Sequence, residues 1–224
     1  MQSQQARVTW KDGVPVSTAF DDPYFSLENG VAETRHVFLN GNDLQARWGS
    51  GFRIAELGFG TGLNLAVTAV AWQEADLGGR LQFTSFEQFP MAADECAQAL
   101  SFFPEVAGVR APLVEALATG AEQFTLFGSI DVTLIFGDAR ETVPTWGDQA
   151  DAWYLDGFSP AKNPELWSEA LMRAVFEHTA PGGTAATYAA AGFVRRNLSD
   201  AGFSVERTDG FGRKRHMTRA IKPT

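Results

Sequence analysis

Cysteine is almost absent from this sequence. Cys96 is the single cysteine among 224 residues, which excludes an internal disulfide and a cysteine-rich zinc site. Long apolar runs are also missing, and none approaches the roughly 18 residues that a membrane span needs. The opening segment MQSQQARVTW has neither the basic start nor the apolar core of a signal peptide. These absences predict a cytoplasmic protein with no membrane segment.

Basic residues are outnumbered by acidic ones. The formal net charge is −9, which argues against a general affinity for nucleic acid because phosphate contacts need Lys and Arg. Residues 195–222 differ, since eight Lys or Arg and only three acids give this interval a net charge of +5 and leave −14 for the remainder. The interval is either a solvated edge or a local landing site for a polyanion.

The apolar segments that are present indicate the fold class. With 45% hydrophobic and 20% charged residues, the chain fits one globular domain of ordinary size. Strand candidates alternate with helical candidates, as in an α/β sheet with helices on both faces. The strand candidates are 52–57, 81–86, 131–136, 152–155 and 183–189, and the helical candidates are 62–76, 91–101, 112–123, 165–179 and 191–201.

The two ends of the chain predict antiparallel pairing. Strand candidates 203–208 and 213–221 are joined by DGFG, which suggests a hairpin that closes the sheet. Asp12-Gly13 between two apolar arms predicts another hairpin, over 8–17, with one or two short helices after it. We therefore expect a mostly parallel seven-stranded sheet with an antiparallel last strand in 51–224. Residues 1–50 are predicted to form a small hairpin and helical extension packed on that core.

A glycine-rich loop, ELGFGTGLN, follows the first strand candidate. Gly58, Gly60 and Gly62 allow the backbone to approach a ligand closely, and the next helix offers unpaired N–H groups at its start. A dinucleotide site needs G-x-G-x-x-G, with its third glycine where Leu63 stands. The pattern E-x-G-x-G-x-G is instead typical of S-adenosylmethionine (SAM) sites in Rossmann-like methyltransferases. A turn without ligand and an NAD or FAD site are the alternatives. The residues predicted to bind cofactor here are Glu56, Gly58, Gly60, Gly62 and Asn64.

Two acids follow later strand candidates. Glu87 stands at the carboxyl end of the second one, where open α/β sheets bind ligands and an acid can hold both ribose hydroxyls. Asp138, in FGDARE, follows the third one and is placed to meet an adenine edge. Both acids indicate an adenosine-type ligand, but Glu87 does not separate SAM from NAD.

The segment DGFSPAKNPELW follows the fourth strand candidate. It begins with Asp156 and is stiffened by Pro160 and Pro164, as expected of a shaped functional loop. Methyl transfer to an amine needs a free lone pair held about 3 Å from the methyl carbon. A carboxylate that accepts N–H orients that lone pair and compensates developing positive charge. Asp156 is therefore the predicted catalytic residue beside the cofactor; the alternative is an Asp that only turns the backbone.

These segments together resemble a known family. ELGFGTGLN, FGD, AWYLDGFSPAKNPELW, PGGTAATYAAAGFVRRNLSDAGF, GFGRKRHM and STAFDDPYFSLENGVAETRHVFLNGN cover most of the chain. Their order resembles that of the methyltransferase half of the MnmC family, and DGFxPxKNPxxW is the most specific motif. The resemblance implies a class I, Rossmann-like SAM-dependent methyltransferase. It would convert 5-aminomethyl-2-thiouridine to 5-methylaminomethyl-2-thiouridine at the tRNA wobble position, without a metal.

Bifunctional members of that family also carry a flavin-dependent oxidoreductase half. This chain leaves no room for it after its last strand candidate, so we expect the stand-alone form without FAD. The resemblance further implies that an anticodon stem-loop binds the protein with its wobble base splayed out. Tyr24, Phe25 and Phe211 are candidates for stacking, and a monomer is compatible with the sequence. The residues predicted to bind substrate are Phe158, Lys162, Asn163, Arg195, Arg196, Arg213, Lys214 and Arg215.

Three alternatives remain at this point. The protein can be a methyltransferase for another amine in RNA or protein, because the SAM pattern does not name the acceptor. It can be a nicotinamide or flavin oxidoreductase acting on CH–NH groups, although glycine spacing and chain length oppose this. A non-catalytic RNA-binding module is the third, and the intact loop at Asp156 argues against it.

Overall fold

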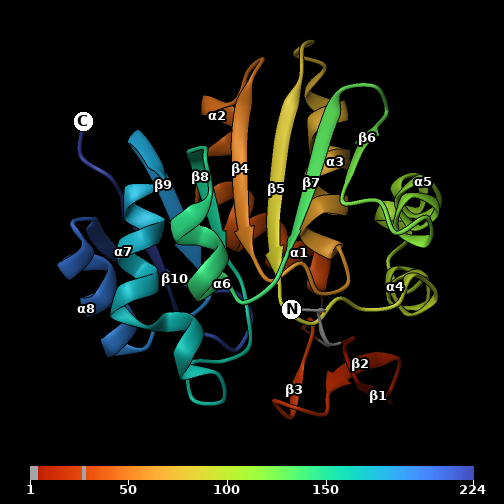
Figure 1. The fold of residues 1–224 in the computed structure, drawn as a ribbon, viewed down its shortest axis with the longest axis horizontal. Coiled ribbons are helices and arrows are strands. Elements are labelled where there is room, and N and C mark those ends of the chain that lie inside the picture. The colour runs from red at the N-terminus through yellow and green to blue at the C-terminus, as the bar shows by residue number, and fades with distance from the viewer. Residues whose placement is uncertain (1–4, 27–28) are drawn as a thin grey trace.

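The fold is built on one large, twisted sheet. A computed structural model describes residues 5–26 and 29–224, and in it eight strands follow the order β10-β11-β9-β8-β4-β5-β7-β6 (Figure 1). All neighbours pair in parallel except those that involve β11 and β6. The strands are β4 (Phe52–Leu57), β5 (Leu81–Glu87), β6 (Gln123–Leu126), β7 (Ile130–Phe136), β8 (Ala150–Leu155), β9 (Thr179–Thr187), β10 (Ser204–Asp209) and β11 (His216–Ile221).

The mostly parallel α/β sheet with its antiparallel last strand confirms the predicted fold class, but the predicted count of seven strands is wrong. The eighth strand, β6, lies at the edge and pairs antiparallel with β7. The helix expected over 112–123 is α5 (Ala107–Ala118), which begins and ends five residues earlier. Gly120 with a φ of +72° follows it, and Phe127 and Gly128, also with positive φ, turn the chain from β6 into β7. The predicted helix therefore included Gln123, the first residue of this short edge strand.

Helices cover both faces of the sheet and make three layers (Figure 1). Side chains of α3 (Leu63–Ala75) and α5 pack on one face together with Ile54 and Phe83. Side chains of α7 (Glu169–Glu177) and α8 (Gly192–Ala201) pack on the other face with Leu57 and Trp153. The remaining helical segments of the core are α4 (Ala93–Leu100), η2 (Pro104–Val106), α6 (Ala139–Thr142), η3 (Val143–Thr145) and η4 (Pro164–Trp167). Among the residues described, no helix combines the length and apolarity needed to cross a membrane.

The alternation of side chains along β4 places a polar group inside the molecule. Ile54 belongs to the hydrophobic cluster under α3, whereas Ala55 and Leu57 belong to the cluster under α7 and α8. Successive strand side chains point to opposite faces, so Glu56 falls on the same face as Ile54. Its side chain is 0% exposed, and it therefore needs hydrogen-bond donors inside the protein.

The N-terminal segment forms a small second sheet and short helices. Strands β1 (Val8–Lys11), β2 (Val14–Ser17) and β3 (Asp22–Pro23) pair antiparallel, and Asp12 and Gly13 with positive φ make the predicted hairpin turn. The helical segments are α1 (Gly30–Thr34), the π-helical η1 (Arg35–Asn40) and α2 (Leu44–Arg47). Phe38 and Leu44 share the core cluster of α3. The division at residue 50 stays a prediction.

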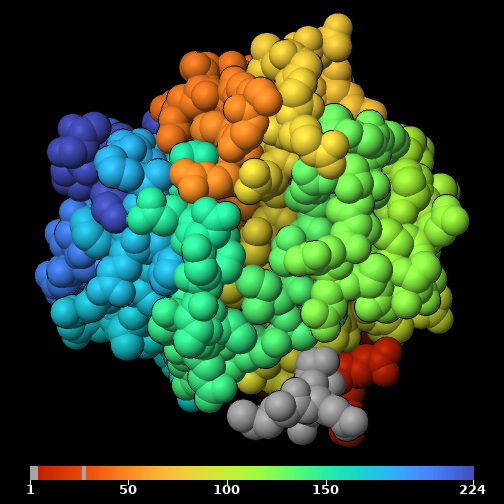
Figure 2. Space-filling model, turned by 45° about the horizontal axis from the view of Figure 1, so that its top comes forward, coloured from red at the N-terminus to blue at the C-terminus, as the bar shows by residue number. Residues whose placement is uncertain are grey.

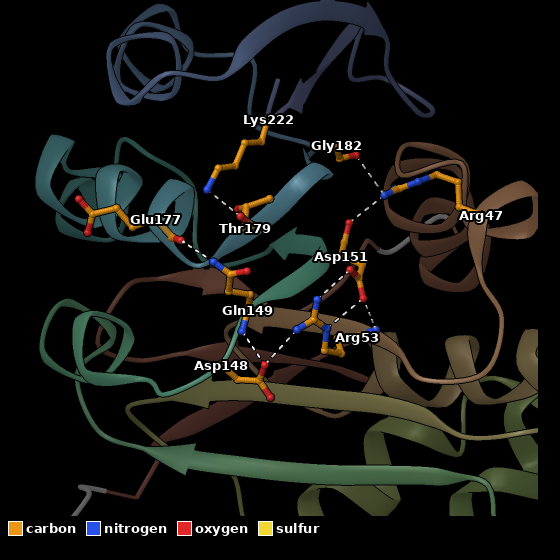
Figure 3. A network of polar contacts seen from close by, with 9 residues as sticks. All are labelled: Arg47, Arg53, Asp148, Gln149, Asp151, Glu177, Thr179, Gly182 and Lys222. Atoms are coloured by element: carbon orange, nitrogen blue, oxygen red, sulfur yellow. Dashed lines mark hydrogen bonds and ion pairs between the residues drawn. The ribbon is translucent and has the colours of Figure 1, made fainter. Parts of the chain in front are cut away.

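The small sheet lies beneath the carboxyl ends of β4 and β5 in Figure 1, and its red-coloured residues form part of the lower edge of the molecule in Figure 2. The opposite, amino ends of β4 and β8 carry a network of ion pairs (Figure 3). Arg53 binds Asp151 through Nε at 3.1 Å and Nη2 at 3.0 Å, and it contacts Asp148 at 3.1 Å. Arg47 donates to the backbone carbonyls of Asp151 and Gly182 at 2.9 and 3.4 Å. Arginine ion pairs and hydrogen bonds thus occupy this end of the sheet.

Candidate active site

A cavity of about 1240 Å³ opens at the carboxyl ends of the strands. Strand β4 lies between β5 and β8, so the chain order reverses there, and open α/β sheets bind ligands at that point. Ten of the residues predicted to bind cofactor or substrate line it: Gly58, Gly60, Asn64, Glu87, Asp138, Asp156, Phe158, Asn163, Arg213 and Lys214. Six others are not part of its wall: Glu56, Gly62, Lys162, Arg195, Arg196 and Arg215.

The glycine loop brings two strand ends together. Gly58 has a φ of +84°, and a Cβ at this position would lie 2.9 Å from the carbonyl oxygen of Asp156. Gly60 has a φ of +55° and passes under the ring of Tyr24. Gly62 starts α3 with a φ of +78° and faces Phe59 in the core. Gly62 therefore shapes the turn and stands back from the cavity, unlike the other two glycines.

Glu87 is a buried carboxylate that points at the cavity. It is 8% exposed, and its oxygens accept the backbone N–H groups of Gly60 at 2.9 Å and Phe89 at 2.7 Å. No described Lys, Arg or His side chain forms an ion pair with it. Burial raises its pKa, and the two N–H groups oppose that effect. Each oxygen keeps a second lone pair, so the carboxylate fits a pair of hydroxyl donors such as those of a ribose.

Asp138 lines the same cavity but is already engaged. It accepts the backbone N–H of Arg140 at 2.9 Å and so starts α6. The guanidinium of Arg140 binds both carboxylate oxygens through Nε at 3.0 Å and lowers the pKa of Asp138. A ligand amine that meets Asp138 must share it with Arg140, and the adenine contact stays a prediction.

Asp156 lies at the end of β8 and is partly buried. Its Oδ2 accepts the amide N–H of Asn64 at 2.7 Å, and its Oδ1 accepts the backbone N–H of Gly157 at 2.9 Å. Burial raises its pKa to about 6; the hydrogen bonds and the positive charge of Lys214 oppose the rise. Above that pH the group is a carboxylate with lone pairs left to accept N–H from an amine.

Glu56 holds the Asn64 amide that donates to Asp156. Its Oε1 accepts the second amide N–H of Asn64 at 2.9 Å, and its Oε2 accepts the hydroxyl of Ser85 at 2.7 Å. Burial raises the pKa of Glu56 well above its ordinary value. Because Glu56 has no exposed surface, the expectation that it contacts the cofactor is corrected: it holds Asn64.

The loop after Asp156 is fastened to the N-terminal sheet. The backbone N–H of Ser159 donates to Asp22 Oδ2 at 2.8 Å. Lys162, expected to bind substrate, instead forms ion pairs with Asp21 at 3.6 Å and Asp22 at 3.4 Å. The ring of Phe158 stacks on Phe20 with centroids 4.7 Å apart. The N-terminal segment is thus part of the cavity wall.

The cavity wall includes residues that the sequence did not mark as part of the site, among them Glu33, Thr34 and Tyr188. Lys214 Nζ donates to Glu33 Oε1 at 2.7 Å and lies 3.9 Å above the ring of Tyr188. The hydroxyl of Tyr188 donates to the carbonyl of Gly157. These residues stand in segments that carried the family resemblance but no recognisable chemical motif. Only the fold brings them to the cavity that Asp156 also lines.

The basic C-terminal interval is partly structural. Arg195 donates to the carbonyl of Ala190 at 2.6 Å, and Lys222 donates to the carbonyls of Phe176 and Thr179 (Figure 3 includes the second). Arg196 and Arg215 are exposed outside the cavity. Across residues 5–26 and 29–224, no group of three or more His, Cys, Asp or Glu side chains is arranged to hold a metal ion.

Known proteins similar to this chain include bifunctional ones. A family model described as an S-adenosyl-L-methionine-dependent methyltransferase matches residues 105–223. The tRNA 5-methylaminomethyl-2-thiouridine biosynthesis bifunctional protein MnmC of Chromobacterium violaceum is 42% identical over 97% of this chain and 34% of its own length. Its namesake in Pseudomonas paraeruginosa is 44% identical over 96% of this chain and 34% of its own length. The chain thus spans about a third of the length of these relatives.

A solved structure agrees in fold over the whole chain. The crystal structure of MNMC2 from Aquifex aeolicus superposes with a TM-score of 0.78 at 25% identity, covering 100% of this chain and 73% of the other. The oxidoreductase alternative is not favoured by these matches. With its cavity at the switch point of the sheet and this degree of identity to MnmC, the chain belongs to the S-adenosyl-L-methionine-dependent methyltransferases of the MnmC methyltransferase family.

Proposed function

We propose that this protein methylates the amine of 5-aminomethyl-2-thiouridine at the wobble position of tRNA, giving 5-methylaminomethyl-2-thiouridine. The observation that carries the proposal is the placement of Asp156. Its carboxylate faces the cavity, and the two described groups that donate hydrogen bonds to it, the Asn64 amide and the Gly157 N–H, are neutral and fix its orientation. The names of the MnmC relatives supply the acceptor.

The methyl donor fits the half of the cavity formed by β4 and β5. Glu87 is positioned to accept both ribose hydroxyls, and the backbone at Gly58 and Gly60 lets the donor approach closely. Asp138 lies farther along the wall, beside Arg140, for the adenine edge. Bound there, S-adenosyl-L-methionine supplies an electrophilic methyl group on a sulfonium that leaves as a neutral thioether.

Asp156 acts on the acceptor amine. Its free lone pairs accept N–H, which turns the nitrogen lone pair toward the methyl carbon. As the N–C bond forms, positive charge develops on the nitrogen, and the carboxylate stabilises it and takes the released proton. The pKa of about 6 suits this role, because the group is ionised at neutral pH yet still basic enough to accept a proton.

The tRNA is proposed to reach the cavity from the side of the basic interval. Phe158 and Asn163 lie on the wall for contact with the splayed base, and Arg213 and Lys214 line the same cavity. Arg195, Arg196 and Arg215 lie outside it and are placed for phosphates of the anticodon stem-loop. Lys162 contributes through the loop that it fastens. Such an enzyme works where tRNA is modified, so we propose a cytoplasmic location.

The test is a methyl-transfer assay on the full chain. Purified protein, S-adenosyl-L-methionine and tRNA bearing the aminomethyl group are incubated, and the nucleosides are analysed by mass spectrometry. We expect 5-methylaminomethyl-2-thiouridine to appear, and no product from tRNA that lacks the aminomethyl group. Methylation of other nucleosides alone, or calorimetric binding of NAD but not of S-adenosyl-L-methionine, would refute the proposal.

A further inference from the structure

The side chain of Asn64 has all of its hydrogen-bonding groups occupied within the protein. Its two N–H groups donate to Glu56 Oε1 at 2.9 Å and to Asp156 Oδ2 at 2.7 Å. Its Oδ1 accepts the hydroxyl of Thr34 at 2.8 Å. A primary amide has two donor hydrogens, so none is left for a cofactor. The Asn64 side chain thus connects other residues, and its contact with the cofactor stays a prediction.

The orientation of this amide matters for Asp156. Turned by 180°, the amide would direct its oxygen at the two carboxyl groups and remove the donor that fixes Asp156. Thr34 favours the orientation in which the Asn64 amide donates to Asp156, because its hydroxyl donates to Asn64 Oδ1. Thr34 is 4% exposed and Asn64 is 7% exposed, so bulk water does not replace the Thr34 hydroxyl freely.

We propose that Thr34 is a positioning residue for methyl transfer, whose hydroxyl fixes the Asn64 amide so that Asp156 presents its free lone pairs to the acceptor amine. The inference rests on the proposed function for the identity of that amine. It makes α1, in the N-terminal segment, part of the catalytic arrangement, because Thr34 is the last residue of α1.

Several other groups face Asp156 and must be kept constant in any test. Lys214, between β10 and β11, lowers its pKa, and Glu33, in α1, raises it. Glu56 in β4 and Tyr188 after β9 also interact with its charge. Substituting Thr34 leaves all four side chains in place. A change in the titration of Asp156 then reports on the amide between them.

The variants are Thr34→Val, which removes the hydroxyl at nearly constant volume, and Thr34→Ser, which keeps it. Thr68→Val is the matched control. Thr68 lies one turn after Asn64 in α3 and is fully buried. Its hydroxyl is 3.0 Å from that of Tyr154. It tests the cost of losing a buried hydroxyl beside the same helix without touching Asn64.

The titration of Asp156 is followed by carbon-13 NMR of its carboxyl group, assigned with Asp156→Asn. In Thr34→Val we expect the midpoint to move to higher pH, because a hydrogen bond that favours the carboxylate is weakened. Turnover should fall roughly threefold to tenfold, the range of one neutral hydrogen bond, with unchanged affinity for S-adenosyl-L-methionine. Thr34→Ser and Thr68→Val should behave like the wild type. In Asn64→Ala, adding Thr34→Val should cause no further shift.

Two outcomes would overturn the inference. One is a Thr34→Val protein that titrates and turns over like the wild type. The other is an equal shift in Thr68→Val, which would indicate general loosening of the core. A shift confined to Thr34→Val, in a protein that does not methylate aminomethylated tRNA, would refute the proposed acceptor and leave the positioning role standing.

Discussion

Carboxylates at the two ends of the neighbouring strands β4, β5 and β8 are held in opposite ways. At the amino ends, Asp151 is held by two nitrogens of Arg53, which also reaches Asp148 (Figure 3). At the carboxyl ends, Glu87 and Asp156 are held by backbone and amide N–H groups, with no ion pair among the described residues. One end uses charge for stability; the other keeps carboxylates ionisable and their lone pairs available. This contrast locates function more sharply than burial does.

The largest expected effect comes from removing the carboxylate of Asp156. In Asp156→Ala, turnover should fall about 10²- to 10⁴-fold, the usual contribution of a positioned base. The affinity for S-adenosyl-L-methionine should stay nearly unchanged, since Asp156 acts on the acceptor. Single-turnover methyl transfer and calorimetry measure the two quantities. Activity close to that of the wild type would show that Asp156 only shapes the backbone.

Glu87 should separate binding from turnover. In Glu87→Gln, an NH₂ group replaces one carboxylate oxygen. This donor faces the N–H of Gly60 or Phe89 and cannot accept a hydroxyl of the ribose. The dissociation constant for S-adenosyl-L-methionine should rise about 10- to 100-fold, as expected for lost charge-assisted hydrogen bonds. Calorimetry gives this value directly. An unchanged constant would remove Glu87 from the ribose site.

Asp151→Asn tests the other end of the sheet. The change leaves the guanidinium of Arg53, whose side chain is 29% exposed, without its bidentate partner. The free energy of unfolding should fall by about 1–3 kcal/mol, while turnover and cofactor affinity stay as in the wild type. Urea unfolding measures the first quantity. Loss of activity in a folded Asp151→Asn protein would break the division between the two ends.

Asp156→Asn should change stability in the opposite direction, and by an amount that depends on pH. Folding raises the pKa of Asp156 from 3.8 to about 6, so the folded state binds the proton more tightly than the unfolded state. The wild type therefore loses stability as pH rises through this window, and Asn does not titrate. Melting curves should show the variant gaining on the wild type between about pH 4 and pH 6. A constant difference across that range would mean that Asp156 is not desolvated.

Most of the sheet was predictable because its strands are buried on both faces and read as short apolar runs. The segment FRIAEL became β4 with the predicted bounds. The edge strand β6 was missed because an edge buries little, and Phe124 and Leu126 are too few to signal alternation beside a helical pattern. Strand identity was thus clearest where burial was greatest.

The position of Glu87 and Asp156 on the cavity wall was predictable because each acid stands at the carboxyl end of a strand, and their roles there stay predictions. The support for those groups was not predictable. Thr34 meets Asn64 only through the fold, and Lys162 binds Asp22 of the N-terminal sheet instead of facing the cavity. Contacts between distant segments leave no local pattern in a sequence, so the partners of a motif stay hidden when the motif itself is clear.

The N-terminal and C-terminal segments contact each other at several points, and on the cavity wall Lys214 pairs with Glu33. Arg219 donates to the carbonyl of Gly41 at 2.6 Å and pairs with Asp43, and a ring nitrogen of His36 lies 2.9 Å from the carbonyl oxygen of Asp209. During synthesis on the ribosome, the segment around α1 therefore cannot form these contacts until almost the whole chain has been made. Contacts this distant in sequence slow folding. The active cavity should be among the last parts of the protein to form, long after β4 and β5 can pair.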